Sequence, residues 1–375
     1  MGALTFFLIA GEPSGDKLGA ALMAGLKTLA PDVIFHGIGG PLMQAQGLTS
    51  QFPMEELSVM GIAEVLPKYF ALKRRIAEAA AAVTALAPAA LITIDSPDFC
   101  LRVAGLVKKA RPGQRIIHYV APSVWAWRPG RAARMARVVD HVLALLPFEP
   151  PYMTAAGMTC DFVGHPVAAE PLATAAERAT LADVPRPLIL CLPGSRRSEV
   201  TRLAPIFGAT LGLLAKRHPG LTIALPTLPH LAELIGELTR EWPVKPRVIL
   251  DPAAKRAAFA EADAALAASG TVSLELAANA TPMVIAYDMH PISWWLMKRA
   301  ALIDTVTLVN LVSQSRAVPE FLGPACRPPA IADALTAVLS DSSAQAQAMA
   351  ATMQGLGKGG EPPGLRAARS VMAHL

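Results

Sequence analysis

Short apolar segments rich in β-branched and aromatic residues alternate with segments rich in Ala and Leu along this chain of 375 residues. The first kind of segment is typical of a buried strand and the second of a helix. This alternation predicts parallel sheets with helices on both faces. In the first half we expect strands at 4–10, 33–40, 89–95, 115–122, 141–148 and 160–166, and helices from Lys17 and over 99–110.

The alternation pauses once and restarts, which predicts two domains. Residues 171–187, rich in Ala, Thr and Pro, are interpreted as a linker. We expect a Rossmann-like domain over 1–170 and another over 188–349, with a C-terminal helix near 350–375 packing back on the first. The predicted fold class is α/β, two Rossmann-like domains facing a central cleft as the default ligand site. Strands of the second half are expected at 187–195, 221–227, 247–251, 262–270 and 281–287.

Composition narrows the function classes. Mean hydropathy is +0.40, but the best apolar stretch, 77–94, is interrupted by Pro88, so no membrane-spanning helix is expected. The net charge of +5 suits anionic lipid or phosphorylated substrates and falls short of a nucleic-acid-binding signature. No cysteines, acids or histidines have metal-ligand spacing, so neither a metal nor another cofactor is expected.

One glycine-containing loop, "LPGSRRSEV" (192–200), leads from an expected strand into a helix. Free backbone amides and the helix dipole favour an anion at such a place. Gly194 and Ser195 would let amides approach a phosphate, and Arg196 would grip a pyrophosphate with two donors. The alternative is a capped helix with solvated arginines.

A second such loop is "ASGTVSLE" (268–275), where Ser269, Gly270 and Thr271 form a small polar turn. Glu275 lies one helical turn further on, and its carboxylate could accept both hydroxyls of a ribose. Ordinary charge complementarity at a helix N-terminus is the alternative. A third place, "GEPSGD" (11–16), lacks the glycine spacing of a dinucleotide-binding loop.

Two carboxylates in "TIDSPDF" (93–99) follow an expected strand. The carboxyl edge of a doubly wound sheet is where its chemistry is found, so Asp95 or Asp98 could act as general base. Each could instead cap the next helix. We favour Asp95 as the base, because Asp98 follows Pro97 where the helix begins and its carboxylate is more easily engaged by capping amides.

Two further segments have both a binding and a structural interpretation. In "YVAPSVWAWRPGRAARMAR" (119–137), Trp125 could flank a sugar or acyl chain and Arg128 could meet a phosphate, or the arginines could be solvated. The apolar residues of 62–76 recur at helical spacing and are flanked by Lys and Arg. That helix could lie on a membrane surface or face the core.

Ten motifs occur in an order that resembles the lipid-A-disaccharide synthase family. They are "AGEPSGD", "MEELSVMGIAEVL", "IDSPDF", "HYVAPSVWAWRPGR", "LPFEP", "FVGHP", "LPGSRRSE", "ASGTVSLE", "PMVIAY" and "LVNLV". The resemblance covers about residues 6 to 325. It implies a two-Rossmann GT-B fold and an inverting, metal-independent transfer of 2,3-diacylglucosamine from its UDP carrier to 2,3-diacylglucosamine 1-phosphate.

The resemblance also implies a cytoplasmic protein held peripherally on the inner face of the inner membrane, and it is compatible with a homodimer. It assigns acceptor-side contacts to Ser14, Gly15, Asp16, Met60, Trp125, Arg128, Asn310 and Arg316. It assigns the lipid surface to Val65, Leu66, Tyr69, Leu72 and Lys73. The alternatives are another GT-B enzyme acting on UDP-N-acetylglucosamine, either the peptidoglycan N-acetylglucosaminyltransferase or a 2-epimerase, and a non-catalytic nucleotide-sugar-binding protein.

Overall fold

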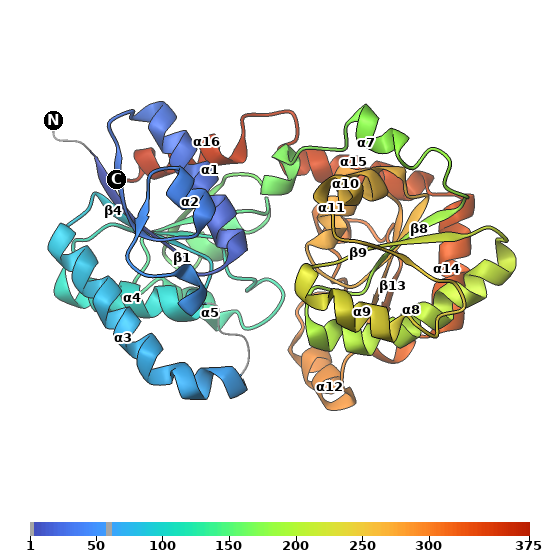
Figure 1. Ribbon diagram of the computed structural model, residues 1–375. Coiled ribbons are helices and arrows are strands. Elements are labelled where there is room, and N and C mark those ends of the chain that lie inside the picture. The colour runs from blue at the N-terminus through green and yellow to red at the C-terminus, as the bar shows by residue number, and fades with distance from the viewer. Residues whose placement is uncertain (1–3, 58–61) are drawn as a thin grey trace. The chain divides into compact units, whose positions relative to one another are not determined.

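The computed structural model describes residues 4–57 and 62–375, with the side chains of 58–69 outside that description. The chain divides into two compact units (Figure 1), unit 1 being residues 1–169 with 359–375, and unit 2 residues 170–358. Residues 171–187, expected as a linker, belong to unit 2. They carry the short helix α7 (Ala175–Ala179), which ion pairs join to α10 (Pro252–Glu261).

Unit 1 is built on a parallel sheet with strand order β3-β2-β1-β4-β5-β6-β7. Its strands are β1 Thr5–Ala10, β2 Ile34–Ile38, β3 Thr49–Ser50, β4 Ala90–Ile94, β5 Ile116–Tyr119, β6 His141–Ala144 and β7 Thr159–Phe162. Its helices are α1 Pro13–Leu29, α2 Pro41–Ala45, α3 Ile62–Leu86, α4 Pro97–Ala110, α5 Gly130–Met135, α6 Pro150–Thr154 and α16 Pro363–Ala373, with 3-10 turns at Met54–Glu56 and Pro166–Ala169. The short strand β3 was not expected from the sequence.

Alternate residues of β1 enter two different cores, as the period of a strand requires. Phe7 and Ile9 pack with residues of α3 and α4, while Phe6 and Leu8 pack with residues of α1 and α16. Helices therefore cover both faces of the sheet, which explains why the strands are almost continuously apolar.

Helix α1 begins four residues earlier than the sequence predicted. Pro13 and not Lys17 is its first residue, and the amide of Asp16 donates to the carbonyl of Glu12 at 2.9 Å to close the first turn. Proline is well suited to this position, because the first amides of a helix have no intrahelical acceptor. "GEPSGD" is thus mostly a helical turn rather than an open loop.

The C-terminal helix α16 packs on α1 in unit 1. The two backbones approach closely at Gly25 and Gly364, where a Cβ on Gly25 would lie 2.5 Å from the Gly364 carbonyl oxygen. A buried polar contact adds to this packing, since Ser370 of α16 lies 2.8 Å from Nε2 of His141 and donates to Asp161 at 2.7 Å.

Unit 2 repeats the architecture with strand order β10-β9-β8-β11-β12-β13, all parallel. Its strands are β8 Leu188–Leu192, β9 Thr222–Pro226, β10 Arg247–Ile249, β11 Ala264–Ala267, β12 Met283–Tyr287 and β13 Glu320–Leu322. Its other helices are α8 Arg197–Arg217, α9 Ala232–Leu238, α11 Val272–Ala278, α12 Pro291–Ala300, α13 Leu308–Val312, α14 Pro328–Ser340 and α15 Ser343–Gly355, with 3-10 turns at Pro229–Leu231 and Gly323–Ala325. Strand β13 was not expected.

Both sheets reverse their direction of growth at one pair of neighbouring strands. In unit 1 the pair is β1 and β4, and in unit 2 it is β8 and β11. Loops that leave such a pair diverge to opposite faces of the sheet and leave room for a ligand at its carboxyl edge. Within the described residues, no helix is both long enough and apolar enough to cross a bilayer.

Candidate active site

The carboxyl edge of β8 and β11 carries a pocket of about 530 Å³. Its walls include the loops 193–196 and 268–271, which meet because Leu192 and Ala267 are paired across the two strands. The pocket is lined by all seven residues that the sequence assigned to UDP, namely Gly194, Ser195, Arg196, Ser269, Gly270, Thr271 and Glu275.

Backbone geometry explains a glycine in each loop. Gly194 has φ +119° and Gly270 has φ +152°, conformations that L side chains rarely adopt. A Cβ at Gly194 would also lie 2.7 Å from a carboxylate oxygen of Glu199. The loops can therefore turn sharply at the strand ends and present backbone to the pocket.

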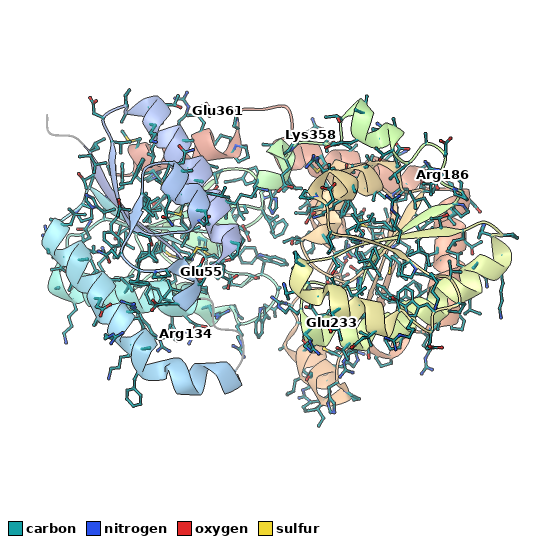
Figure 2. All side chains as sticks on the ribbon, viewed as in Figure 1. Glu55, Arg134, Arg186, Glu233, Lys358 and Glu361 are labelled. Atoms are coloured by element: carbon teal, nitrogen blue, oxygen red, sulfur yellow. The ribbon has the colours of Figure 1, made fainter. Side chains whose placement is uncertain are left out.

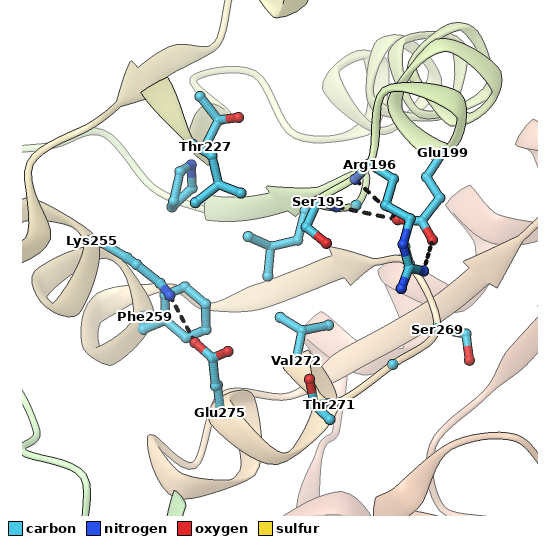
Figure 3. A pocket seen from close by; sticks show the side chains of 16 residues that line it. Ser195, Arg196, Glu199, Thr227, Lys255, Phe259, Ser269, Thr271, Val272 and Glu275 are labelled. Atoms are coloured by element: carbon cyan, nitrogen blue, oxygen red, sulfur yellow. Dashed lines mark hydrogen bonds and ion pairs between the residues drawn. The ribbon is translucent and has the colours of Figure 1, made fainter. Parts of the chain in front are cut away.

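Glu199 occupies the anion-binding position at the start of α8 (Figure 3). Its carboxylate accepts from the amides of Ser195 and Arg196 at 3.3 Å each and from the Arg196 guanidinium at 3.0 Å. These are the donors expected to meet a diphosphate, and here they already surround a negative charge. Sequence reasoning missed Glu199, although its place three residues after the N-cap is the signature of a capping box.

On the other side of the pocket, Lys255 donates to Glu275 at 2.8 Å, and its ammonium group lies 5.1 Å from the centre of the Phe259 ring. Lys255 and Phe259 are one turn apart on α10 and line the same pocket. The ion pair holds the Glu275 carboxylate in place. No sequence signal separates these residues from any other lysine and phenylalanine on an amphipathic helix.

In unit 1, Asp95 and Asp98 follow β4 as predicted, but their environments differ from the expectation. Asp95 has φ +53°, Ser96 has φ +42°, and α4 begins at Pro97. Burial raises the pKa of Asp95, and a hydrogen bond from the Ser96 amide opposes the shift. A partly buried carboxylate at a strand end can serve as a base.

Asp98 is not the capping residue that the sequence predicted. It is exposed, and among the described residues its carboxylate caps no helix amide. It lines a cavity of about 240 Å³ together with Arg128, Arg131 and Arg134, of which Arg134 is labelled in Figure 2. Arg128 also lies over the Trp127 ring, 4.2 Å from its centre. Three guanidinium groups around one cavity can bind a phosphate.

Asp16, which the resemblance assigns to the acceptor side, is engaged within unit 1. This carboxylate is 3% exposed and accepts from the amides of Gly40, Leu42 and Met43 at 2.9–3.0 Å, which caps the N-terminus of α2. Its acceptors are thus occupied by protein. Ser14 is exposed, and Gly15 is buried beside the end of β4, where a Cβ would lie 3.4 Å from the carbonyl of Ile94.

Asn310 and Arg316, which the resemblance assigns to the acceptor side, both belong to unit 2. The Asn310 side chain is buried and bonds to the amide and carbonyl of Val318 at 3.0 Å, so it fixes the loop before β13. Arg316 is paired with Asp304. Met60 lies outside the described residues.

Trp125 has a buried partner that the sequence did not single out. Its indole donates to Glu149 at 3.2 Å, and Glu149 also accepts from the amides of Leu145 and Leu146. Burial raises the pKa of Glu149 to about 7. The Trp125 ring meets Phe148 edge to face at 5.1 Å. The indole is thus fixed at the end of β6, with part of its surface still exposed.

One cluster with metal-ligand chemistry lies away from both sites. Ligand atoms of His141, Asp161 and His374 are all within 4.8 Å of one another. Local spacing along the chain does not reveal this cluster, because the three residues come from β6, β7 and the segment after α16. The rings of His141 and His374 are stacked at 3.8 Å, and both nitrogens of His141 have hydroxyl partners. These contacts attach the C-terminal segment to the sheet.

The two doubly wound units, with an anion-binding pocket at a switch point of unit 2, define a GT-B-type α/β protein. Solved structures with this fold include MurG of Acinetobacter baumannii (16% identical, TM-score 0.60, all of both chains covered). UDP-GlcNAc 2-epimerase of Neisseria meningitidis, bound to UDP-GlcNAc, is another (12% identical, TM-score 0.63, 100% of this chain and 99% of that one). At these identities the likeness concerns the fold alone.

Sequence comparison identifies the family. The profile described as lipid-A-disaccharide synthetase matches residues 6–361. Lipid-A-disaccharide synthase of Ruegeria pomeroyi is 60% identical, over 98% of this chain and 95% of that protein. The enzyme of the same name from Rhodospirillum centenum is 48% identical, over 99% and 95%. The chain belongs to the lipid-A-disaccharide synthase family, and it is a glycosyltransferase.

Proposed function

We propose that this chain transfers 2,3-diacylglucosamine from UDP-2,3-diacylglucosamine to the 6-hydroxyl of 2,3-diacylglucosamine 1-phosphate, releasing UDP. The observation that carries the proposal is that one pocket of unit 2 gathers both loops assigned to UDP. The family match and the 60% identity favour this reaction over the epimerase and peptidoglycan alternatives, which share only the fold.

In this proposal the donor lies in the pocket of unit 2. Its diphosphate accepts hydrogen bonds from the amides of Ser195 and Arg196 and from the Arg196 guanidinium, and it displaces the Glu199 carboxylate from these donors. The ribose hydroxyls meet Glu275, which Lys255 holds in place. Arg196 and the helix N-terminus stabilise the negative charge that grows on UDP as the sugar–phosphate bond breaks.

The acceptor is assigned to the carboxyl edge of unit 1. Its phosphate suits the cavity formed by Arg128, Arg131 and Arg134, and a carboxylate there takes the proton of the attacking hydroxyl. The new bond joins that oxygen to C1 of the donor sugar on the face opposite UDP, so the configuration inverts. Because Asp98 does not cap its helix, the reason for ranking it below Asp95 is gone, and both remain candidates for the base.

We further propose peripheral contact with the cytoplasmic face of the inner membrane through α3. The predicted lipid-surface residues Val65, Leu66 and Tyr69 have side chains outside the described part. Next to them Phe70 is 80% exposed, Leu72 is half-buried and Lys73 is exposed. An apolar side chain exposed between basic residues is typical of a helix on an anionic lipid surface.

The test is incubation of the purified full chain with both lipid substrates in mixed micelles. We expect stoichiometric release of UDP and a β-1,6-linked disaccharide 1-phosphate, and no UDP when either substrate is omitted. Release of UDP without the acceptor, or conversion of UDP-N-acetylglucosamine to its 2-epimer, would contradict the proposal.

A further inference from the structure

Helix α12 of unit 2 is apolar, aromatic and basic, with the sequence PISWWLMKRA, and none of its residues is buried. Ile292, Trp295 and Leu296 are 65%, 56% and 56% exposed. In Figure 1 this helix lies at the lower margin of its unit, outside the helices that flank the sheet. In the folded unit this apolar surface is exposed to water, and an exposed apolar patch of this kind is typical of an interaction site.

The exposed residues share one face of the helix. Ile292, Trp295, Leu296 and Arg299 are spaced i, i+3, i+4 and i+7, so they lie side by side. Trp294 points elsewhere and packs on Gly323, where a Cβ would lie 2.6 Å from its ring. Trp294 therefore attaches α12 to the unit and leaves the face of Ile292, Trp295 and Leu296 outward.

The charge around this face is positive. The Arg299 guanidinium lies 4.9 Å from the centre of the Trp295 ring, and neither Lys298 nor Arg299 has an acidic partner among the described residues. The acidic residues on either side of the helix are already paired, Asp288 with Arg202 and Asp304 with Arg316. Lys298 and Arg299 are thus available to an external anion.

We propose that α12 is a lipid-contact surface, in which Ile292, Trp295 and Leu296 enter the headgroup region of an anionic bilayer while Lys298 and Arg299 meet its phosphates. Tryptophan favours the boundary between apolar and aqueous phases, and basic side chains are attracted to anionic leaflets. This contact is separate from that proposed for α3, because it belongs to the other unit. The inference rests on the proposed function in one respect: the proposed substrates are lipids, and a contact with the bilayer would bring the protein to them.

The place of α12 in unit 2 relates the proposed lipid contact to the nucleotide pocket. It begins shortly after β12, whose last residue, Tyr287, lies near Glu199 and Arg196 of the nucleotide pocket. Burial and the Glu199 carboxylate raise the pKa of Tyr287. A bilayer held by α12 would therefore lie close to the diphosphate end of the pocket, where the acylated sugar of a donor begins.

The experiment is vesicle flotation of the full chain with Phe70→Ser and Leu72→Ser, so that α3 contributes little. Vesicles contain phosphatidylcholine with phosphatidylglycerol, or phosphatidylcholine alone. Adding Ile292→Ser, Trp295→Ser and Leu296→Ser should lower the partition coefficient about tenfold. The matched control, Val248→Ser with Leu250→Ser, removes exposed apolar side chains near β10 and should change nothing. Lys298→Gln with Arg299→Gln should weaken the preference for anionic vesicles.

A second measurement uses a single substitution. Quenching of tryptophan fluorescence by brominated acyl chains should occur in the wild type and be largely lost in Trp295→Phe. Unchanged flotation of the triple variant, or unchanged quenching in Trp295→Phe, would overturn the inference. The inference would also be overturned if sedimentation without lipid showed a dimer for the wild type and a monomer for the triple variant, because α12 would then contact a second copy of the chain. Turnover in mixed micelles distinguishes the proposed transferase activity from the proposed lipid contact of α12. The α12 variants should keep this turnover. A wild type without turnover would refute the transferase activity and would leave the vesicle result unaffected.

Discussion

At the scale of single residues, the two loops at the carboxyl edge of β8 and β11 carry most of the candidate chemistry. Glycines give the loops their turns, and Glu199 holds the donors that a diphosphate would use. Arg196 is exposed, and within the described residues its guanidinium is paired with Glu199 alone, so its charge contributes little to folding. Substitutions in these loops should therefore separate function from stability.

Arg196→Ala should strongly reduce transfer with little change in unfolding free energy. Loss of a charge-assisted contact to the diphosphate costs roughly 2–4 kcal/mol in the transition state, a fall in kcat of about 30- to 1000-fold. Steady-state release of UDP and urea unfolding measure the two effects. Arg197→Ala is the matched control, since that side chain is exposed and does not line the pocket. Near-normal turnover of Arg196→Ala would remove this residue from the mechanism.

Glu275→Ala should raise KM for the UDP-sugar more than it lowers kcat. A ribose contact lies far from the reacting carbon and acts mainly as uniform binding, so a rise of roughly tenfold in KM is expected. Lys255→Ala should give a smaller rise, because it removes the ion pair that orients the carboxylate. Glu233→Ala serves as the control, because Glu233 of α9, labelled in Figure 2, is exposed and does not line the pocket. A fall in kcat at constant KM would assign Glu275 another role.

The base is assigned by comparing Asp95→Asn with Asp98→Asn. Asparagine keeps the shape but cannot take a proton, so the variant of the true base should lose about 10²- to 10⁴-fold in kcat. A base works deprotonated, so activity falls as the pH drops through its pKa. Because burial raises the pKa of Asp95, its acid limb would lie at higher pH than that of an ordinary aspartate. Turnover above a small fraction of wild type in both variants would mean that neither residue is the base.

At the scale of elements, the close approach of α1 and α16 connects the two ends of unit 1. Gly25 and Gly364 let the helix backbones touch, and Ser370 joins α16 to His141 and Asp161. The sequence predicted that a C-terminal helix would pack on the first domain, without naming its partner. In the structure α16 packs on α1 within unit 1, whereas α15 belongs to unit 2.

Gly25→Val should lower the unfolding free energy by about 1–3 kcal/mol, because the new side chain must push α16 away from α1. Ala24→Val places the same side chain on the exposed side of α1 and should cost only helix propensity, a few tenths of a kcal/mol. Urea unfolding measures both, and limited proteolysis within 359–375 reports release of α16. Equal stability of the two variants would show that the contact contributes nothing.

At the scale of the whole molecule, the proposed function divides donor and acceptor binding between two similar units. In each, the chain reverses its direction of sheet growth next to the first strand, which places loops from distant segments at one edge. In the proposed reaction, positive charge for the leaving group comes from Arg196 and from backbone amides at the start of α8, and no divalent cation is expected to be required.

Transfer should therefore proceed in the presence of EDTA, with kcat within about twofold of its value in added Mg²⁺. The measurement is UDP release by wild-type protein purified in EDTA. Loss of activity on chelation, restored by Mg²⁺ or Mn²⁺, would contradict this prediction and indicate a metal site near the diphosphate.

The sequence by itself determined the fold class, the family and the two glycine loops of unit 2. Apolar periodicity and local turn chemistry are properties of neighbouring residues, so Gly194, Arg196 and Glu275 could be found by reading along the chain. The short strands β3 and β13 and the start of α1 at Pro13 were missed, because pairing partners and first-turn geometry outweigh local propensity there.

Only the tertiary structure decided which polar side chains are occupied and which are available. Asp16 is engaged by α2, Asn310 by the loop before β13, and Asp98 is left open beside three arginines, although all three match the same family pattern. The pairing of Lys255 with Glu275 and of Glu149 with Trp125 also joins residues 20 or more positions apart. Hydrogen bonding and burial depend on neighbours in space, and a sequence specifies those neighbours only through the packing of the whole unit.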